Sequence, residues 1–162
     1  MWNWKPIYED KGIACYLDID NIIDLEEDQD GLYHSVECYT PIFKRAGAWV
    51  TVLFKQVDMI EEYKRERQRN GLATDGYDDY SSSLCLIDID CEQRLYRVIP
   101  VTDHDGEGKI LGHSTIVSEK EGGLIPGISS EWSPIYSENT NEVIQKVFQF
   151  ISGSPDGPEG AS

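Results

Sequence analysis

Positive charge is scarce in this chain of 162 residues, which has 14 Lys and Arg against 30 Asp and Glu and a formal net charge of −16. Such a surface repels the phosphates of nucleic acids and the headgroups of anionic membranes. We therefore expect no nucleic-acid partner. The same charge would attract a basic protein surface or a cation, although an acidic domain that is merely soluble is the simpler explanation of the numbers.

Long hydrophobic runs and an export signal are also missing. No stretch reaches the roughly 18–20 apolar residues that a membrane helix needs, so we expect no membrane span. Trp2, Asn3 and Trp4 lead directly into charged residues, without the apolar core and small-residue cleavage site of a secretory signal. We expect a cytoplasmic protein as the chain is written, or a periplasmic or surface protein if a signal peptide was removed.

Catalytic signatures are few. The chain has three histidines, His34, His104 and His113, and it contains no nucleophile elbow, phosphate loop or H-E-x-x-H motif. Nucleophilic catalysis needs a nucleophile, a base within reach and a group that orients the base. We therefore predict a protein that is not an enzyme, with no catalytic residue and no cofactor.

The four cysteines, Cys15, Cys38, Cys85 and Cys91, follow no metal-binding spacing. Cys85 and Cys91 fall on one predicted strand about 20 Å apart, beyond the roughly 7 Å between Cα atoms that a disulfide allows. These two thiols therefore cannot bridge each other. Buried free thiols and at least one disulfide with another partner both remain open.

Strand patterns dominate the chain. The clearest segment, Ser82–Asp90, places Ile87 and Ile89 on one side and Leu86 and Asp88 on the other. Short turns link consecutive segments, which favours an antiparallel meander. We predict about six strands, at residues 12–19, 32–39, 48–55, 82–90, 94–101 and 109–117.

Two helices complete the predicted fold. Asp58–Arg69 is charged with a thin apolar stripe, typical of an exposed helix. A second helix is expected to begin near Ser137 or Asn139, with an apolar stripe at Val143, Ile144, Val147, Phe148 and Ile151 that would pack on the sheet. We predict one α+β domain at residues 1–151, an antiparallel sheet with a C-terminal helix on one face, and a disordered tail at residues 152–162.

Two acidic segments raise the question of metal binding. The stretch Glu26–Glu37 places Asp28, Asp30, Gly31 and Glu37 at calcium-loop positions. A strand-like segment and Pro41 follow, so no outgoing helix is available and a solvated hairpin turn is the better interpretation. The turn at Asp103, Asp105 and Glu107 is an alternative weak cation site. We predict no metal-binding residue.

Two further groups have an ordinary and a functional interpretation. The basic residues of the predicted first helix suit a solvated helix face, or a contact for an acidic or glycosylated partner: Lys64, Arg65, Arg67 and Arg69. Aromatic residues near the N-terminus suit core packing and cross-strand pairs, or an exposed binding surface: Trp2, Trp4, Tyr8, Tyr16, Tyr33 and Tyr39. We favour the ordinary interpretation for both groups.

Several segments together resemble the surface-adhesin protein E family. They are the N-terminal pattern of Trp4, Ile7, Tyr16, Asp18 and Ile22, the strand AWVTVLFK from Ala48, the hairpin YSSSLCLIDIDCEQRLYRVIPV from Tyr80 with its Asp90-Cys91 step and Tyr96-Arg97, and Trp132-Ser133-Pro134 before the C-terminal helix. The resemblance implies an antiparallel sheet crossed by a helix and an exported, non-enzymatic protein of the adhesin type. It also implies dimerisation through the sheet.

The sequence departs from this family at one bridge. In the family, the cysteine of the Asp-Cys step pairs with a cysteine near the end of the C-terminal helix. Here the end of that helix offers only Val147, Phe148, Phe150 and Ile151 in place of a cysteine, so the bridge of Cys91 cannot form in the same way. We take a protein-binding domain of the adhesin E type as the first hypothesis, and an acidic cytoplasmic inhibitor or immunity-type protein that binds a basic partner as the alternative. Seven residues are expected to be structural: Trp49, Ile87, Ile89, Cys91, Tyr96, Val98 and Phe148.

Overall fold

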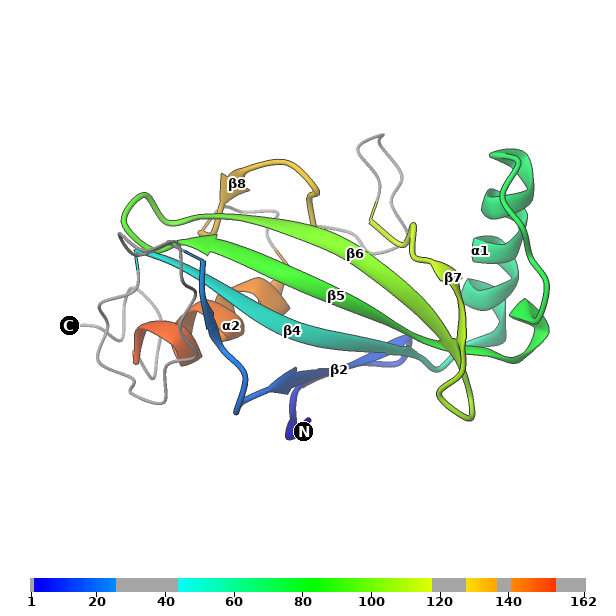
Figure 1. Ribbon diagram of the computed structural model, residues 1–162, viewed down its shortest axis with the longest axis horizontal. Helices are drawn as coiled ribbons and strands as arrows, with labels where there is room; N and C mark the ends of the chain where they lie inside the picture. The colour runs from blue at the N-terminus through cyan, green and yellow to red at the C-terminus, as the bar shows by residue number, and fades with distance from the viewer. Residues whose placement is uncertain (1, 26–43, 118–127, 137–140, 154–162) are drawn as a thin grey trace.

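The chain folds into one antiparallel sheet with a helix at one end and a second helix on its inner face (Figure 1). This computed structural model describes residues 2–25, 44–117, 128–136 and 141–153. The strands are β1 (Trp4–Glu9), β2 (Ile13–Asp18), β3 (Ile23–Asp24), β4 (Arg45–Phe54), β5 (Tyr80–Asp90), β6 (Leu95–Asp105), β7 (Ile110–His113) and β8 (Ser133–Pro134).

The order along the sheet is β1-β2-β4-β5-β6-β7, and every pair is antiparallel. The short strands β3 and β8 pair with β4 and β6. The predicted fold class, an α+β domain with a largely meandering antiparallel sheet and a C-terminal helix, is confirmed. The long strands β4 and β5 form its centre, and their alternating apolar residues bury one face.

Some predicted boundaries were wrong. The segment expected as a strand over 109–117 ends as a strand at His113, because the backbone N–H of Thr115 turns to donate to the Tyr63 hydroxyl (2.8 Å). β1, β3 and β8 were not predicted. The register of β1 shifts after Pro6, so its sequence lacks a regular alternation. The strand expected at 32–39 lies outside the described residues.

The C-terminal helix α2 (Glu142–Ser152) starts later than expected. Asn141 caps it, because its side-chain oxygen accepts a hydrogen bond from the N–H of Val143 (2.8 Å). Gly153 closes it with φ of 74°, a left-handed conformation that glycine adopts without strain. Ser152, expected to begin the tail, is therefore the last helical residue, and residues 154–162 lie outside the described part of the chain.

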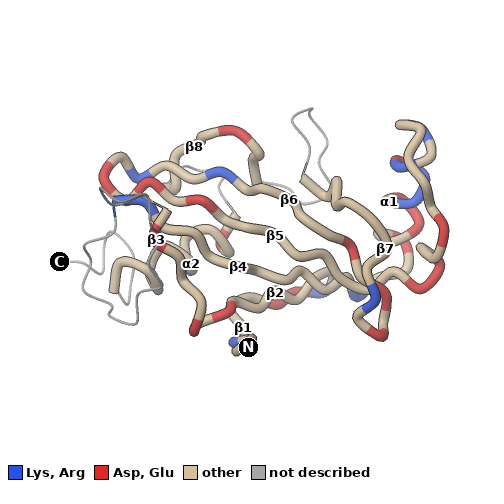
Figure 2. Tube along the Cα trace, viewed as in Figure 1, with Lys and Arg blue, Asp and Glu red and all other residues tan. Residues whose placement is uncertain are grey.

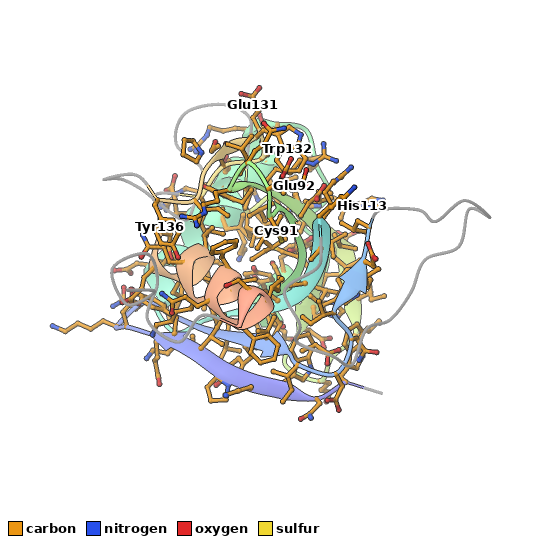
Figure 3. The ribbon with its side chains drawn as sticks, turned by 90° about the vertical axis from the view of Figure 1, so that its left-hand side faces the viewer. Cys91, Glu92, His113, Glu131, Trp132 and Tyr136 are labelled. Carbon is orange, nitrogen blue, oxygen red and sulfur yellow. The ribbon has the colours of Figure 1, made fainter. Side chains whose placement is uncertain are left out.

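The core lies between α2 and the inner face of the sheet (Figures 1 and 3). The whole predicted apolar stripe of α2 is buried, and α2 contacts β1. Most of the residues expected to be structural lie here, namely Ile87, Ile89, Tyr96, Val98 and Phe148. Cys91 is half-buried and packs against the same core.

The other helix, α1 (Val57–Arg69), stands at the far end of the sheet from α2 (Figure 1). A short 3₁₀ turn, Tyr77–Asp79, lies within the segment expected to be a loop. Two side chains of α1, Tyr63 and Arg67, are buried. The helix was therefore predicted at the right place, but it is fastened to the sheet by polar groups as well as by its apolar stripe.

Candidate functional site

All four tryptophans of the chain lie on the outer face of the sheet, opposite the core. The register sets this face, because Trp49 pairs with Leu86, which pairs with Ile99. Alternation along β4 sends Ala48 and Val50 into the core and Trp49 outward. We call this surface the tryptophan face and define it by Trp2, Trp4, Trp49, Trp132, Leu86 and Ile99.

Three of the tryptophans form one cluster. Trp4 in β1 is in register with Asp18. Trp2 stacks on Trp4 with ring centroids 5.1 Å apart and an interplanar angle of 13°. Its edge also meets Trp49, at 6.1 Å and 85°. These are the offset-stacked and edge-to-face arrangements that the ring quadrupoles favour.

The tryptophan face is open to solvent. Trp2 is 51% exposed, Trp132 40% and Ile99 38%, and Trp4, Trp49 and Leu86 are half-buried. The core-packing interpretation of the N-terminal aromatics was therefore wrong for Trp2, and Trp49 is not a core residue. Tyr8 and Tyr16 are also half-buried, and Tyr33 and Tyr39 lie outside the described residues.

A charged group borders the tryptophan face. The buried carboxylate of Asp88 accepts hydrogen bonds from Arg45 Nη2 (2.6 Å) and Arg97 Nε (3.0 Å). The guanidinium carbons of Arg45 and Arg97 lie 5.4 Å and 4.8 Å from the ring centroid of Trp132. The ion pairs fix the two arginines, and the cation–π contacts fix the indole ring above them.

A second polar cluster is buried near α1, around Asp103. Its carboxylate accepts hydrogen bonds from the hydroxyls of Tyr63 (2.6 Å), Tyr77 (2.7 Å) and Ser83 (2.5 Å). Arg67 Nη1 lies 3.5 Å from the same carboxylate. Asp103 was expected in an exposed turn with Asp105 and Glu107, and that prediction was wrong. It belongs to β6, its side chain faces inward, and it is fully buried.

Arg67 corrects the expectation of a solvated basic face on the first helix. Its guanidinium donates to the backbone oxygens of Ala73 (3.0 Å) and His113 (2.7 Å) and lies 4.4 Å from the Tyr77 ring centroid. Lys64 instead pairs with Asp78 at the surface, and Arg65 and Arg69 pair with Glu62. One basic residue in this helix therefore anchors the fold while its neighbours meet solvent.

The hydrogen bonds of the Asp103 cluster have a structural role, which is to hold α1 against the sheet. Burial raises the pKa of Tyr63 to about 12 and also raises the pKa of Tyr77, so both hydroxyls stay protonated and can donate at neutral pH. Ser83 and Asp103 are fully buried, where no substrate reaches them. The cluster joins α1, the 3₁₀ turn, β5 and β6.

The histidines and the acidic turn do not converge on a site. The ring of His104 meets Thr102 Oγ1 (2.8 Å) and the carbonyl of Gly108, and His113 is exposed. Asp105 Oδ1 accepts from the backbone N–H of residues 107 and 109. The described residues contain no group of three or more His, Cys, Asp or Glu side chains placed to hold a metal ion. His34 and the stretch 26–37 lie outside them.

Three cysteines are free thiols in the described chain: Cys15, Cys85 and Cys91. Burial raises the pKa of Cys15 to about 12 and that of Cys91 to about 11, so both stay protonated at neutral pH and are poor nucleophiles. Cys38 lies outside the described residues. The cysteines therefore point to packing rather than to reactivity.

In comparisons with known proteins, no family model, no curated protein and no solved structure matches the chain. The adhesin E-like resemblance therefore rests on the quoted sequence segments alone. In the described ranges, neither helix is long and apolar enough to cross a membrane.

Proposed function

We propose that the chain is a non-enzymatic protein-binding domain and that the tryptophan face is its binding site. The observation that carries the proposal is the exposure of aromatic and apolar side chains on the outer sheet face. The side chain of Trp2 is half exposed, and those of Ile99 and Trp132 are exposed to a somewhat smaller fraction. Soluble domains place large apolar groups together at the surface mainly where a partner covers them.

The residue types of the face suit a protein partner. Trp and Arg dominate the binding energy of protein interfaces, because they combine a large apolar area with directional contacts. Trp2 and Trp132 are prepared for this role, since stacking on Trp4 and on Arg45 and Arg97 already limits their motion. A preorganised side chain loses less entropy on binding.

Both sequence hypotheses are compatible with this site. A surface adhesin E-like protein and an acidic inhibitor would each bind another protein through an exposed face. The adhesin-type hypothesis has the resemblance in its favour, and the inhibitor-type hypothesis has the net charge of −16. The proposed function is protein binding in either case.

Site-specific photo-crosslinking tests the proposal. A photoreactive phenylalanine analogue at Ile99 lies on the tryptophan face, and the same analogue at Val57, which is 69% exposed on α1, is the matched control. After irradiation in an extract of the source organism, we expect one discrete protein adduct from position 99 and none from position 57.

The pair Trp2→Ala and Trp49→Ala should abolish that adduct, because it removes most of the aromatic cluster without touching the core. Adducts of equal yield at both positions, or an adduct that survives the double substitution, would contradict the proposal. The thermal unfolding midpoint of the double variant is measured in parallel, so that loss of the adduct is not confused with loss of the fold.

A further inference from the structure

We infer that the segment bound by the tryptophan face is a basic stretch of polypeptide, in which Lys or Arg side chains stand beside apolar ones. This inference rests on the proposed function and adds the chemistry of the partner. It follows from the charges around the face and from the cation–π geometry that the face already contains.

The charges on the face leave an excess of carboxylates. Asp88 already engages Arg45 and Arg97, the two arginines of this face. Asp20 is exposed beside the cluster, where its carboxylate accepts a hydrogen bond from Asn3 Nδ2 (2.9 Å). Asp90 is in register with Arg45 on the same side of the sheet and is half-buried.

Asp18 adds to this excess beneath Trp4. Its carboxylate accepts hydrogen bonds from the backbone N–H of Asn3 (3.1 Å) and Asp20 (3.2 Å) and from Asn21 Nδ2 (2.7 Å). These amide groups solvate the carboxylate but carry no positive charge to offset it. Lys5, the cation next to Trp4 in the sequence, pairs with Leu17 and so alternates away from the face.

The electrostatic potential of the whole chain is negative, like that of the tryptophan face. Acidic positions are spread along the length of the sheet (Figure 2), and the formal charge is −16. Such a field steers a cationic partner toward the surface and repels an anionic one. A second copy of the chain carries the same −16, so charge disfavours dimerisation through this face.

The aromatic rings supply a second reason for a cationic partner. Guanidinium groups already lie over an indole of this face, because Arg45 and Arg97 pack on Trp132. Trp2, which is half exposed, offers its ring to an incoming Lys or Arg in the same way. Apolar side chains of the partner would then cover Leu86 and Ile99.

Tryptophan fluorescence tests this inference directly, because every tryptophan of the chain belongs to the face. The probe is a short synthetic peptide that alternates arginine with leucine, and the controls replace each arginine by glutamine or by glutamate. We expect the arginine peptide to shift the emission to shorter wavelength in a saturable way. The glutamine peptide should bind roughly tenfold more weakly or worse, and the glutamate peptide should give no shift.

The salt dependence of peptide affinity and one charge variant distinguish this contact from nonspecific hydrophobic binding. Affinity for the arginine peptide should fall as ionic strength rises, because exposed charges are screened within about 10 Å at 0.1 M salt. Asp20→Asn should weaken binding several-fold. Asp75→Asn, an exposed carboxylate in the loop after α1, should leave it unchanged.

Three results would overturn the inference, and none of them decides the crosslinking test. Equal affinity for the arginine and glutamine peptides would show a face that binds by apolar contact alone. No spectral shift with any peptide would show that a basic segment is not the ligand. A shift that depends on protein concentration without peptide, with a dimer in sedimentation equilibrium, would show that a second copy occupies the face.

Discussion

Replacing Asp103 by alanine should lower the free energy of unfolding by about 3–5 kcal/mol, the typical cost of removing one partner from a buried ion pair. The substitution leaves the hydroxyls of Tyr63, Tyr77 and Ser83 without their acceptor in a site that water does not reach. It also leaves the guanidinium of Arg67 without its counter-charge. Urea unfolding followed by circular dichroism measures the effect.

Two control variants make the result specific. Asp75→Ala removes an exposed carboxylate and should change stability by no more than about 0.5 kcal/mol. Asp103→Asn keeps an acceptor oxygen but loses the charge, so it should fall between the two alanine variants. A loss below about 1 kcal/mol for Asp103→Ala would contradict the assignment of this cluster as the anchor of α1.

Replacing Phe148 by aspartate should unfold the domain or destabilise it by at least about 4 kcal/mol. Phe148 belongs to the buried face of α2, is 7% exposed and meets the ring of Tyr136 edge-on, with centroids 5.9 Å apart. Deleting a buried phenylalanine side chain alone costs about 3–5 kcal/mol, and the buried carboxylate adds its own desolvation penalty. Thermal unfolding at neutral pH is the measurement.

Phe150→Asp is the matched control for this experiment. It introduces the same charge two residues further along the same helix, at a side chain that is 38% exposed. The two variants have the same composition, so only the position relative to the sheet differs. Equal stability of the two proteins would mean that α2 does not bury the face carrying Phe148.

The sequence predicts the sheet well where residues alternate regularly. Ser82–Asp90 and the following strand pair as neighbours in the sheet, and their apolar residues Ile87, Ile89 and Val98 are buried as the pattern indicated. The apolar stripe of α2 was equally predictable, since helical spacing of apolar residues depends only on local sequence. The N-terminal edge strand was missed because Pro6 and a shift of register interrupt its pattern.

The candidate site was only partly predictable. Alternation shows that Trp49 and Ile87 lie on opposite faces, but it does not say which face the helix covers. An apolar residue on a strand is by default assigned to the core, which is why the tryptophan face was missed. Trp2 and Trp4 were considered as an exposed surface, but nothing local indicated that Trp132 would join them from a distant loop.

The buried polar cluster illustrates another limit. Arg67 and Asp103 are far apart in the sequence, and each has charged neighbours that meet solvent. Their pairing depends on how α1 packs against β6, which is a tertiary feature. A period-2 count from the buried residues Tyr96 and Val98 places Asp103 on the outer side of β6. The side chain faces inward because the register of β5 and β6 shifts between Pro100 and Thr102, which reverses the alternation.

Hydroxyl-radical footprinting of the chain, free and bound to its crosslinked or copurified partner, tests the central claim most directly. We predict that Trp2, Trp132 and Ile99 lose reactivity on binding, because the partner covers the outer face of the sheet. Met59 in α1 and Leu72 just after this helix should react equally in both states. Protection near α1 with unchanged reactivity of the tryptophans would contradict the account.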